Sequence, residues 1–390
     1  MISSFNLKLP AQIHFGPGKL AELENIIGRF GTSPLLVLGN RSFSETVHYD
    51  ALHKIFLKLG IQIRTIHIGS EPSPEMIDTI VADHFCNEID LVIAIGGGST
   101  LDGGKAISVM LAEGGHVSRF LEGVGDKIPS GSKIPFIAIP TTSGTGSEAT
   151  SNAVISSVGR QGFKSSLRHD NFTPNFALID PTLTLSCPRA ITVACGMDCF
   201  TQLVEGYLST NSSPFTDVMA LEGIRAIRRS LRLVCEDGSN LLARTDLSYA
   251  ALLSGIVLSN SGLGTVHGFA SAVGGLLSIP HGVICGTLMA QVNSLTLKKL
   301  RITAKDDPAL IKYTELGKIF SDQQNKADAW YQDLFIEEIQ RLSDDLNIEK
   351  LGKYGASITD IQTIVEKTGN KYNPIQLTKE DLAAILRIRI

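Results

Sequence analysis

The sequence predicts two domains: an α/β domain with a parallel sheet in residues 1–185 and an all-helical domain in residues 186–390. The chain has 390 residues, more than one domain usually holds, because domains typically contain about 100–200 residues. Before residue 185, short apolar runs alternate with stretches of helical periodicity, which is typical of a parallel sheet covered by helices on both faces. After it, the strand signals fade and helical stretches follow one another.

Four short apolar runs, each ending in turn-forming residues, are the expected strands of the first domain. They lie at 34–39, 61–69, 90–98 and 134–142. Apolar residues at helical spacing predict helices at 18–30 and 74–85. We place the domain boundary in "IDPTLTLSCPRA", where Pro181 and Pro188 interrupt regular structure. Long helices are expected after it, at 190–210, 214–234 and 243–264.

Composition excludes several classes of partner. The net charge of −4 argues against nucleic acid or an anionic membrane, since both usually require a basic surface. No window approaches the roughly 18 uncharged apolar residues of a membrane span. The first residues lack the basic region and apolar core of a secretory signal, and the six cysteines form no CxxC pair. We therefore expect a cytoplasmic protein with no nucleic-acid or membrane partner.

A glycine-rich turn follows the third expected strand, in "LVIAIGGGSTLDGGKAIS". Gly96, Gly97 and Gly98 let a ligand approach the backbone without meeting a Cβ atom. Ser99 is expected to cap the next helix, whose first N–H groups carry the positive end of the helix dipole. The turn predicts an anion site suited to a pyrophosphate, with a plain strand–helix turn as the alternative. It does not match the GxGxxG fingerprint.

A hydroxyl-rich loop, "IPTTSGTGSEAT", follows the fourth expected strand. Its side chains, Thr141, Thr142 and Thr145 among them, suit phosphate and ribose binding at the carboxyl edge of a parallel sheet. Alone, such a cluster is more often an ordinary loop. Beside the glycine turn, it favours a nucleotide site.

Two histidines and one aspartate in the second domain suggest a metal site. His267 and His281 would lie about 21 Å apart on one straight helix, whereas ligands of one ion lie within roughly 4 Å. The chain must therefore turn between them, and we expect Gly274-Gly275 to break one helix and Pro280 to start the next. Two histidines in a helical core are the alternative.

Asp198 and Gln202 are four residues apart, hence on one face of a helix. An aspartate near a helix start more often serves the helix itself. With His267 and His281, however, Asp198 would complete a catalytic site for a divalent ion that keeps an open position. Such an ion stabilises an alkoxide while hydride leaves carbon. The nucleotide and metal signals together predict hydride transfer in a cleft between the domains.

The sequence as a whole resembles the iron-containing (group III) alcohol dehydrogenases, which share their architecture with glycerol dehydrogenase and dehydroquinate synthase. The resemblance implies an N-terminal dinucleotide-binding domain, a catalytic metal in the interdomain cleft and a homodimer. It rests on the order and spacing of blocks that include "IHFGPGKLAEL", "GSEPSPE", "AIGGGSTLDGGKA", "IPTTSGTGSE", "CGMDCFTQLVEGYLS", "SNSGLGTVHG" and "IPHGVICGTLM".

Carried over by position, the resemblance implies specific roles. The metal ligands would be Asp198, His267 and His281. Asp102 would support the glycine turn or the nicotinamide ribose, and Lys164 would lie near that ribose. The nucleotide would also contact Gly96, Gly97, Gly98, Ser99, Thr141, Thr142 and Thr145.

The chain departs from the alcohol dehydrogenase pattern at two positions. Gln202 stands where a histidine ligand is usual, and Ser271 stands where a histidine often relays a proton. Members resembling glycerol dehydrogenase use Asp, His and His, so a site for Fe²⁺ or Zn²⁺ remains expected. Gln202 would either ligate through its amide oxygen or point at a ligand. The proton would pass through Ser271, water or the nicotinamide ribose hydroxyl.

The expected cofactor is NADP(H), with NAD(H) as the alternative. A carboxylate after the first of the four predicted strands would bind the adenosine ribose and repel a 2′-phosphate. This chain has no carboxylate there, since the residues are Gly39, Asn40 and Arg41. Arg41 suits bidentate pairing with that phosphate.

We therefore predict a metal-dependent alcohol dehydrogenase or aldehyde reductase that acts on a small-molecule substrate. The missing histidine at position 202 keeps a second function open: a metal-free reductase resembling maleylacetate reductase, or a lyase on the same scaffold. The third possible function is nucleotide binding without catalysis.

Overall fold

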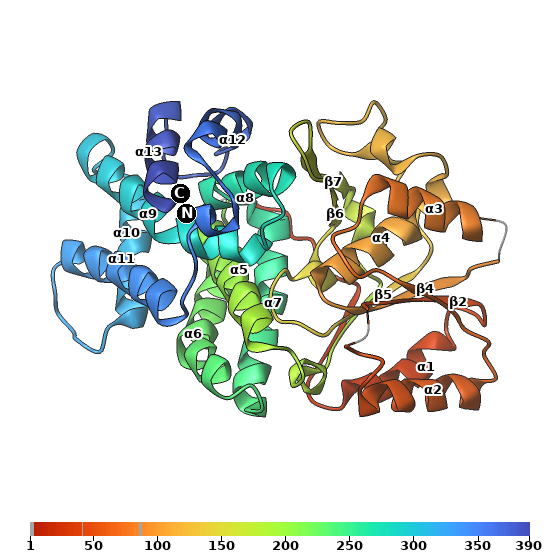
Figure 1. Cartoon of the computed structure of the whole chain (residues 1–390). Helices are drawn as coiled ribbons and strands as arrows, with labels where there is room; N and C mark the ends of the chain where they lie inside the picture. The colour runs from red at the N-terminus through yellow and green to blue at the C-terminus, as the bar shows by residue number, and fades with distance from the viewer. Residues whose placement is uncertain (1–3, 41, 86–87) are drawn as a thin grey trace.

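The computed structural model describes residues 4–40, 42–85 and 88–390, and it confirms an α/β domain joined to an all-helical domain (Figure 1). The main sheet has six parallel strands in the order β1-β8-β5-β4-β2-β3. They are β1 (Gln12–Phe15), β2 (Pro34–Leu38), β3 (Arg64–His67), β4 (Leu91–Gly96), β5 (Phe136–Pro140) and β8 (Phe176–Ile179). The four strands predicted from apolar runs are β2, β3, β4 and β5.

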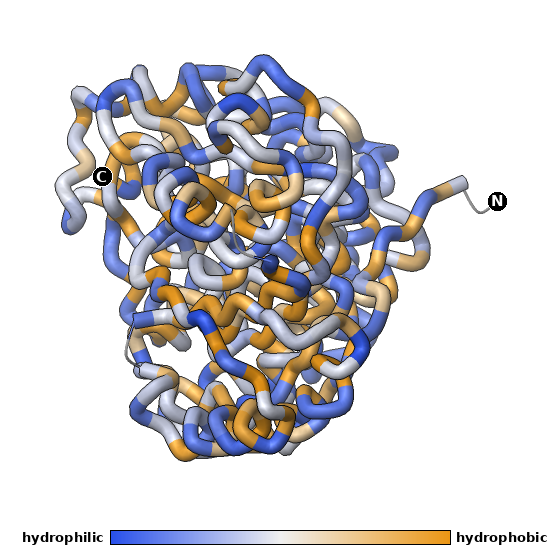
Figure 2. Tube along the Cα trace, turned by 90° about the vertical axis from the view of Figure 1, so that its right-hand side faces the viewer, coloured by the Kyte–Doolittle hydropathy of each residue, from blue (hydrophilic) through white to orange (hydrophobic). Residues whose placement is uncertain are grey.

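Helices cover both faces of the sheet, as the alternating pattern predicts (Figure 1). The helices are α1 (Leu23–Ile27), α2 (Val47–Leu59), α3 (Pro74–His84) and α4 (Gly98–Glu113). Val92 and Ala94 of β4 belong to the apolar core under α3 and α4. Ile93 and Ile95 belong to the core on the opposite face, under α1 and α2. Figure 2 shows the apolar stretches, in orange, gathered inside the molecule.

An antiparallel hairpin extends from the first domain towards the helices. Its strands are β6 (Asn152–Ser157) and β7 (Phe163–Arg168), and β7 packs against α8 (Thr265–Leu276) of the second domain. The apolar-run criterion missed this hairpin because its strands are rich in serine. It also missed the two short strands β1 and β8, which lie outside the four predicted runs.

The second domain consists of helices packed around two apolar cores. The last strand of the sheet ends at Ile179, and the first of these helices begins at Arg189. They are α5 (Arg189–Leu208), α6 (Pro214–Glu236), α7 (Leu241–Ser261), α8 (Thr265–Leu276), α9 (His281–Thr303), α10 (Pro308–Phe320), α11 (Asp328–Asp345), α12 (Ile361–Lys367) and α13 (Lys379–Arg389).

Helix α7 corrects one expectation. Within the described residues, it is the one helix long and apolar enough to cross a membrane by length and composition. However, 67% of its apolar window is buried inside the protein. There α7 packs against α5 and α6, so its apolar character serves the core of the helical domain.

Candidate active site in the interdomain cleft

A cleft of about 1850 Å³ is lined by residues of both domains. The expected nucleotide-binding side contributes Gly39, Asn40, Gly97, Gly98, Ser99, Asp102, Thr141, Thr142, Thr145 and Lys164. The helical domain contributes Asp198, Gln202, His267, Ser271 and His281. Arg41 lies outside the described residues. The structure thus brings the two predicted half-sites to one cavity.

The glycine turn and the hydroxyl-rich loop touch each other at the carboxyl edge of the sheet. A Cβ atom on Gly98 would lie 2.5 Å from the Thr145 side chain, so only glycine lets the two segments pack this closely. Helix α4 begins at Gly98 and its N-cap is Gly97, so the expectation that Ser99 caps the helix is wrong. Ser99 lies in the first turn instead. Its backbone N–H is still among those that a helix start leaves free for an anion.

Gly96 and Asp102 stabilise the glycine turn and its neighbouring loop through packing and hydrogen bonds. A Cβ atom on Gly96 would lie 2.5 Å from the Thr100 hydroxyl, and Gly96 is absent from the cleft lining. The buried carboxylate of Asp102 accepts hydrogen bonds from the Ser147 hydroxyl at 2.5 Å and from the Val154 N–H at 3.2 Å. Asp102 therefore holds the hydroxyl-rich loop against α4.

Lys105 is the residue of this region that sequence reasoning missed. It is fully buried, and its ammonium group donates to the carbonyl oxygens of Ser147, Thr150 and Asn152 at 2.8–3.0 Å. Burial lowers its pKa to about 8, against the opposing effect of Asp102. A lysine inside the glycine-rich run "DGGKAIS" was the available signal, because a lysine among small and apolar residues requires partners when it is buried.

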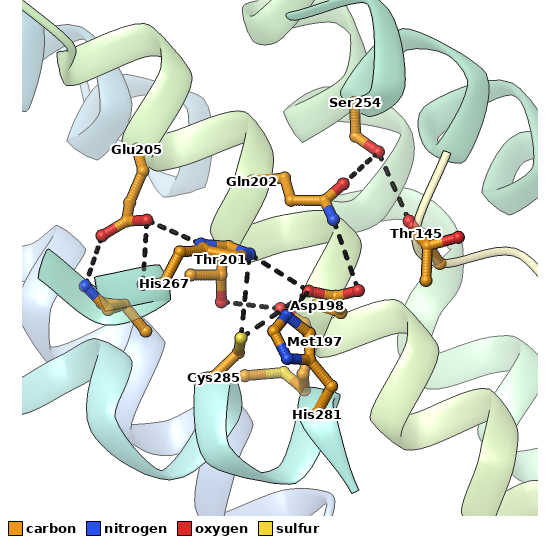
Figure 3. A network of polar contacts seen from close by, with 12 residues as sticks. Thr145, Met197, Asp198, Thr201, Gln202, Glu205, Ser254, His267, His281 and Cys285 are labelled. Carbon is orange, nitrogen blue, oxygen red and sulfur yellow. Dashed lines mark hydrogen bonds and ion pairs between the residues drawn. The ribbon is translucent and has the colours of Figure 1, made fainter. Parts of the chain in front are cut away.

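The candidate metal site, a cluster of ionisable side chains, lies where α5, α8 and α9 meet (Figure 3). Asp198, His267, His281 and Cys285 each offer one ligand atom, and these atoms lie within 4.8 Å of one another. The Asp198 Oδ1 atom is 3.3 Å from His267 Nε2 and 3.6 Å from His281 Nε2. Carboxylate, imidazole and thiol are a donor set that fits a divalent transition ion. Cys285 was not predicted, although it lies one helical turn after His281 and faces the same side.

The turn between the two histidines differs from the expected one. Pro280 is the N-cap of α9 and His281 is its first residue, as predicted. Gly274 and Gly275, however, lie within the last turn of α8 and do not break it. A Cβ atom on Gly275 would lie 3.2 Å from the Phe163 backbone, so these glycines let the β6–β7 hairpin approach α8 closely.

Burial and neighbouring charges set the ionisation of the cluster. Burial lowers the pKa of His281 to about 4, which keeps this imidazole in the neutral form that binds a metal. Burial also raises the pKa of the Cys285 thiol to about 11. At Asp198, burial is outweighed by His281 and His267, which hold the pKa of the carboxylate below its ordinary value. At His267, burial is outweighed by Cys285, Asp198 and Glu205, which raise the pKa.

Gln202 does not direct its amide oxygen at the cluster. Its amide nitrogen donates to Asp198 Oδ2 at 3.3 Å, and its oxygen accepts from the Ser254 hydroxyl at 2.8 Å (Figure 3). We expected Gln202 either to ligate the metal or to point at a ligand. The structure shows the second arrangement, with the Gln202 amide nitrogen directed at Asp198. Ser271 lies on α8 one turn after His267, exposed to the cleft.

Glu205 fixes the orientation of His267. Its buried carboxylate accepts from His267 Nδ1 at 2.7 Å and from the Val266 and His267 backbone N–H groups at 2.6 and 3.3 Å. This leaves Nε2 directed at Asp198. Glu205 was not predicted, although its position seven residues after Asp198 places both on one face of α5.

Glu205→Gln is expected to weaken metal binding by about 10–100-fold, the usual effect of removing the partner of a ligating histidine. Glutamine has one acceptor oxygen, so it cannot serve all three donors that the carboxylate accepts. Competition with a chelator measures the change, and Glu222→Gln, a half-exposed position on α6, is the matched control. Unchanged affinity in Glu205→Gln would show that packing alone orients the ring.

Comparison with known proteins identifies the family. The model of the iron-containing alcohol dehydrogenases matches residues 10–181, and that of the C-terminal domain of the same family matches residues 192–390. The 1,3-propanediol dehydrogenase of Klebsiella pneumoniae is 32% identical, covering 98% of each chain. Long-chain-alcohol dehydrogenase 1 of Geobacillus thermodenitrificans is 31% identical, covering 98% of this chain and 96% of that protein.

Solved structures agree with these matches. A 1,3-propanediol oxidoreductase superposes with a TM-score of 0.88 at 27% identity, covering 100% of both chains. The alcohol dehydrogenase of Oenococcus oeni superposes with a TM-score of 0.87 at 28% identity, covering 99% of this chain and 100% of that one. The matches span both domains, and the chain belongs to the iron-containing alcohol dehydrogenase family, metal-dependent oxidoreductases that act on alcohols.

Proposed function

We propose that the protein interconverts a small aldehyde and its alcohol with NADP(H) in the interdomain cleft. One observation carries this proposal: the glycine turn and the cluster of Asp198, His267 and His281 line the same cavity. The turn offers helix N–H groups to a pyrophosphate. The cluster offers one carboxylate and two imidazoles to a divalent ion.

The residues have separable roles in this reaction. Asp198, His267 and His281 would hold the ion, which when bound would supply Lewis-acid polarisation of the carbonyl oxygen. The glycine turn would hold the dinucleotide that provides the hydride. Glu205 keeps the Nε2 atom of His267 directed at Asp198, where the ion would bind. The Ser271 hydroxyl lies in the cleft one turn from His267, and we assign it proton delivery to the substrate oxygen, with water or the ribose hydroxyl as alternatives.

Metal removal tests the function directly. Aldehyde-dependent oxidation of NADPH is expected to disappear when a chelator strips the protein and to return with Fe²⁺ or Zn²⁺. A panel of short and long aldehydes is the assay, since relatives are named for propanediol and for long-chain alcohols. No metal and no turnover with any carbonyl would refute the proposal. Activity that survives chelation would favour the metal-free reductase.

NADPH is expected to give a higher kcat/KM than NADH. No carboxylate stands among residues 39–42 to repel a 2′-phosphate, and Arg41 suits pairing with it. Relatives of both preferences exist, since one is named an NADPH-dependent butanol dehydrogenase and another an NAD-dependent methanol dehydrogenase. Steady-state kinetics with both cofactors, in the wild type and in Arg41→Ala, is the measurement. Equal values for the two cofactors, or a higher value for NADH, would refute NADP(H) specificity.

A further inference from the structure

We propose that Cys285 is a fourth protein ligand of the metal, and that its sulfur makes the site select Zn²⁺ over Fe²⁺. This inference rests on the proposed function in one respect, namely that a divalent ion binds to Asp198, His267 and His281. It adds a ligand that stands outside the expected set, one helical turn after His281 on α9.

The distances between the donor atoms fit a four-coordinate ion. In a tetrahedral site with nitrogen or oxygen at about 2.0–2.1 Å and sulfur at about 2.3 Å, neighbouring ligand atoms lie roughly 3.3–3.6 Å apart. The Cys285 Sγ atom is 3.6 Å from Asp198 Oδ1 and 3.8 Å from His267 Nε2. The Asp198 Oδ1 atom is 3.3 and 3.6 Å from the Nε2 atoms of His267 and His281. Small side-chain movements suffice to close the shell.

The surroundings leave Cys285 as the best fourth donor. Gln202, the other candidate, has its amide oxygen bound to the Ser254 hydroxyl and presents an N–H group to Asp198. Cys285 is fully buried, and the partners of its sulfur are Asp198 and His267 (Figure 3). The sulfur is therefore shielded from solvent and directed at the other ligand atoms.

Charge and softness favour zinc at such a site. When the ion binds, the S–H bond of Cys285 breaks, a sulfur–metal bond forms and the proton leaves to solvent. The Cys285 thiolate and the Asp198 carboxylate then balance the two positive charges, beside two neutral imidazoles. Thiolate is a soft ligand that favours Zn²⁺ over Fe²⁺, whereas a set of only oxygen and nitrogen donors discriminates less between these two ions.

The sulfur also leaves the substrate side of the site free. Asp198, His267 and His281 line the cleft, and Cys285 does not. Cys285 therefore approaches the ion from the protein interior, so a carbonyl oxygen entering from the cleft does not compete with it. Zinc sites accept such a fifth ligand during catalysis.

X-ray absorption at the zinc edge tests the proposal without reference to activity. Metal-stripped protein is loaded with equimolar Zn²⁺, and we expect one sulfur scatterer at about 2.3 Å beside nitrogen and oxygen at about 2.0–2.1 Å. Cys285→Ser and Cys285→Ala should both lose the sulfur signal and bind Zn²⁺ at least about 100-fold more weakly, the upper end of what losing a ligand's hydrogen-bond partner costs. Cys235→Ser, at a buried thiol on α6, is the matched control and should retain both properties.

Competition between Zn²⁺ and Fe²⁺ under anaerobic conditions measures the selectivity. The wild type should take up zinc preferentially, and Cys285→Ala should lose most of that preference. Zinc bound by the wild type through nitrogen and oxygen alone would overturn the ligand assignment and leave the proposed function intact. Failure of the wild type to bind any ion, with Asp198→Asn behaving identically, would overturn both.

Discussion

Asp198→Asn is expected to lose the metal and to lower kcat for aldehyde reduction by at least about 10³-fold, or roughly 4 kcal/mol of transition-state stabilisation. The Oδ1 atom of Asp198 lies within 3.3–3.6 Å of His267, His281 and Cys285, so it is the shared neighbour of the other donors. Asparagine keeps the shape and removes the negative charge, which leaves the ion without its carboxylate ligand. Elemental analysis and NADPH oxidation measure the two effects together.

The matched control is Asp246→Asn. Asp246 pairs with Arg229 at 3.1 Å across a solvent-exposed edge of α6 and α7, and such pairs contribute about 0–1 kcal/mol. This variant should keep its metal and its activity. Wild-type turnover by metal-free Asp198→Asn would contradict the expectation and would favour the metal-free reductase.

Helical spacing explains which parts of the site the sequence could predict. His267 and His281 were predicted from their place in an apolar stretch, and Asp198 was added as their third partner through the family resemblance. The structure brings the three together. Glu205 lies on the same helix face as Asp198, and Cys285 lies on the same helix face as His281. Periodicity, however, does not show which helix faces contact each other in the folded protein. That pairing depends on how α5, α8 and α9 pack. The packing is a tertiary property that no local pattern contains.

The same limit applies to the fold. Fully buried strands such as β4 and β5 are evident as apolar runs, whereas β6 and β7 carry polar residues that line the cleft. The prediction that Gly274 and Gly275 break the helix was wrong. It rested on the low helix propensity of glycine. In the structure, the absence of side chains at these positions allows the β6–β7 hairpin to pack closely against α8. Lys105 was missed because a single lysine in a helix is usually exposed to solvent. Its burial becomes evident only when the carbonyl oxygens that it contacts are known.

Lys105→Met is expected to destabilise the protein by at least about 3 kcal/mol, because it leaves three buried carbonyl oxygens without their donor, at about 1–3 kcal/mol for each unsatisfied group. Methionine fills a similar volume but donates no hydrogen bond. The carbonyl oxygens of Ser147, Thr150 and Asn152 would lose their donor. Burial already raises the pKa of Asp102 against the opposing effect of Lys105, and loss of that cation would raise the pKa further. Thermal unfolding and urea titration measure the loss.

The hydroxyl-rich loop links this network to the cofactor, since the Lys105 ammonium group anchors the loop at Ser147 while Thr141, Thr142 and Thr145 line the cleft. Lys105→Met should therefore also raise the KM for NADPH, whereas the exposed Lys58→Met should change neither property. Adding Asp102→Asn to Lys105→Met removes the uncompensated carboxylate, so the double variant should be less destabilised than the sum of the single changes. Strictly additive losses would show that Lys105 and Asp102 act independently. The ammonium group would then stabilise the loop through its hydrogen bonds to the carbonyl oxygens alone.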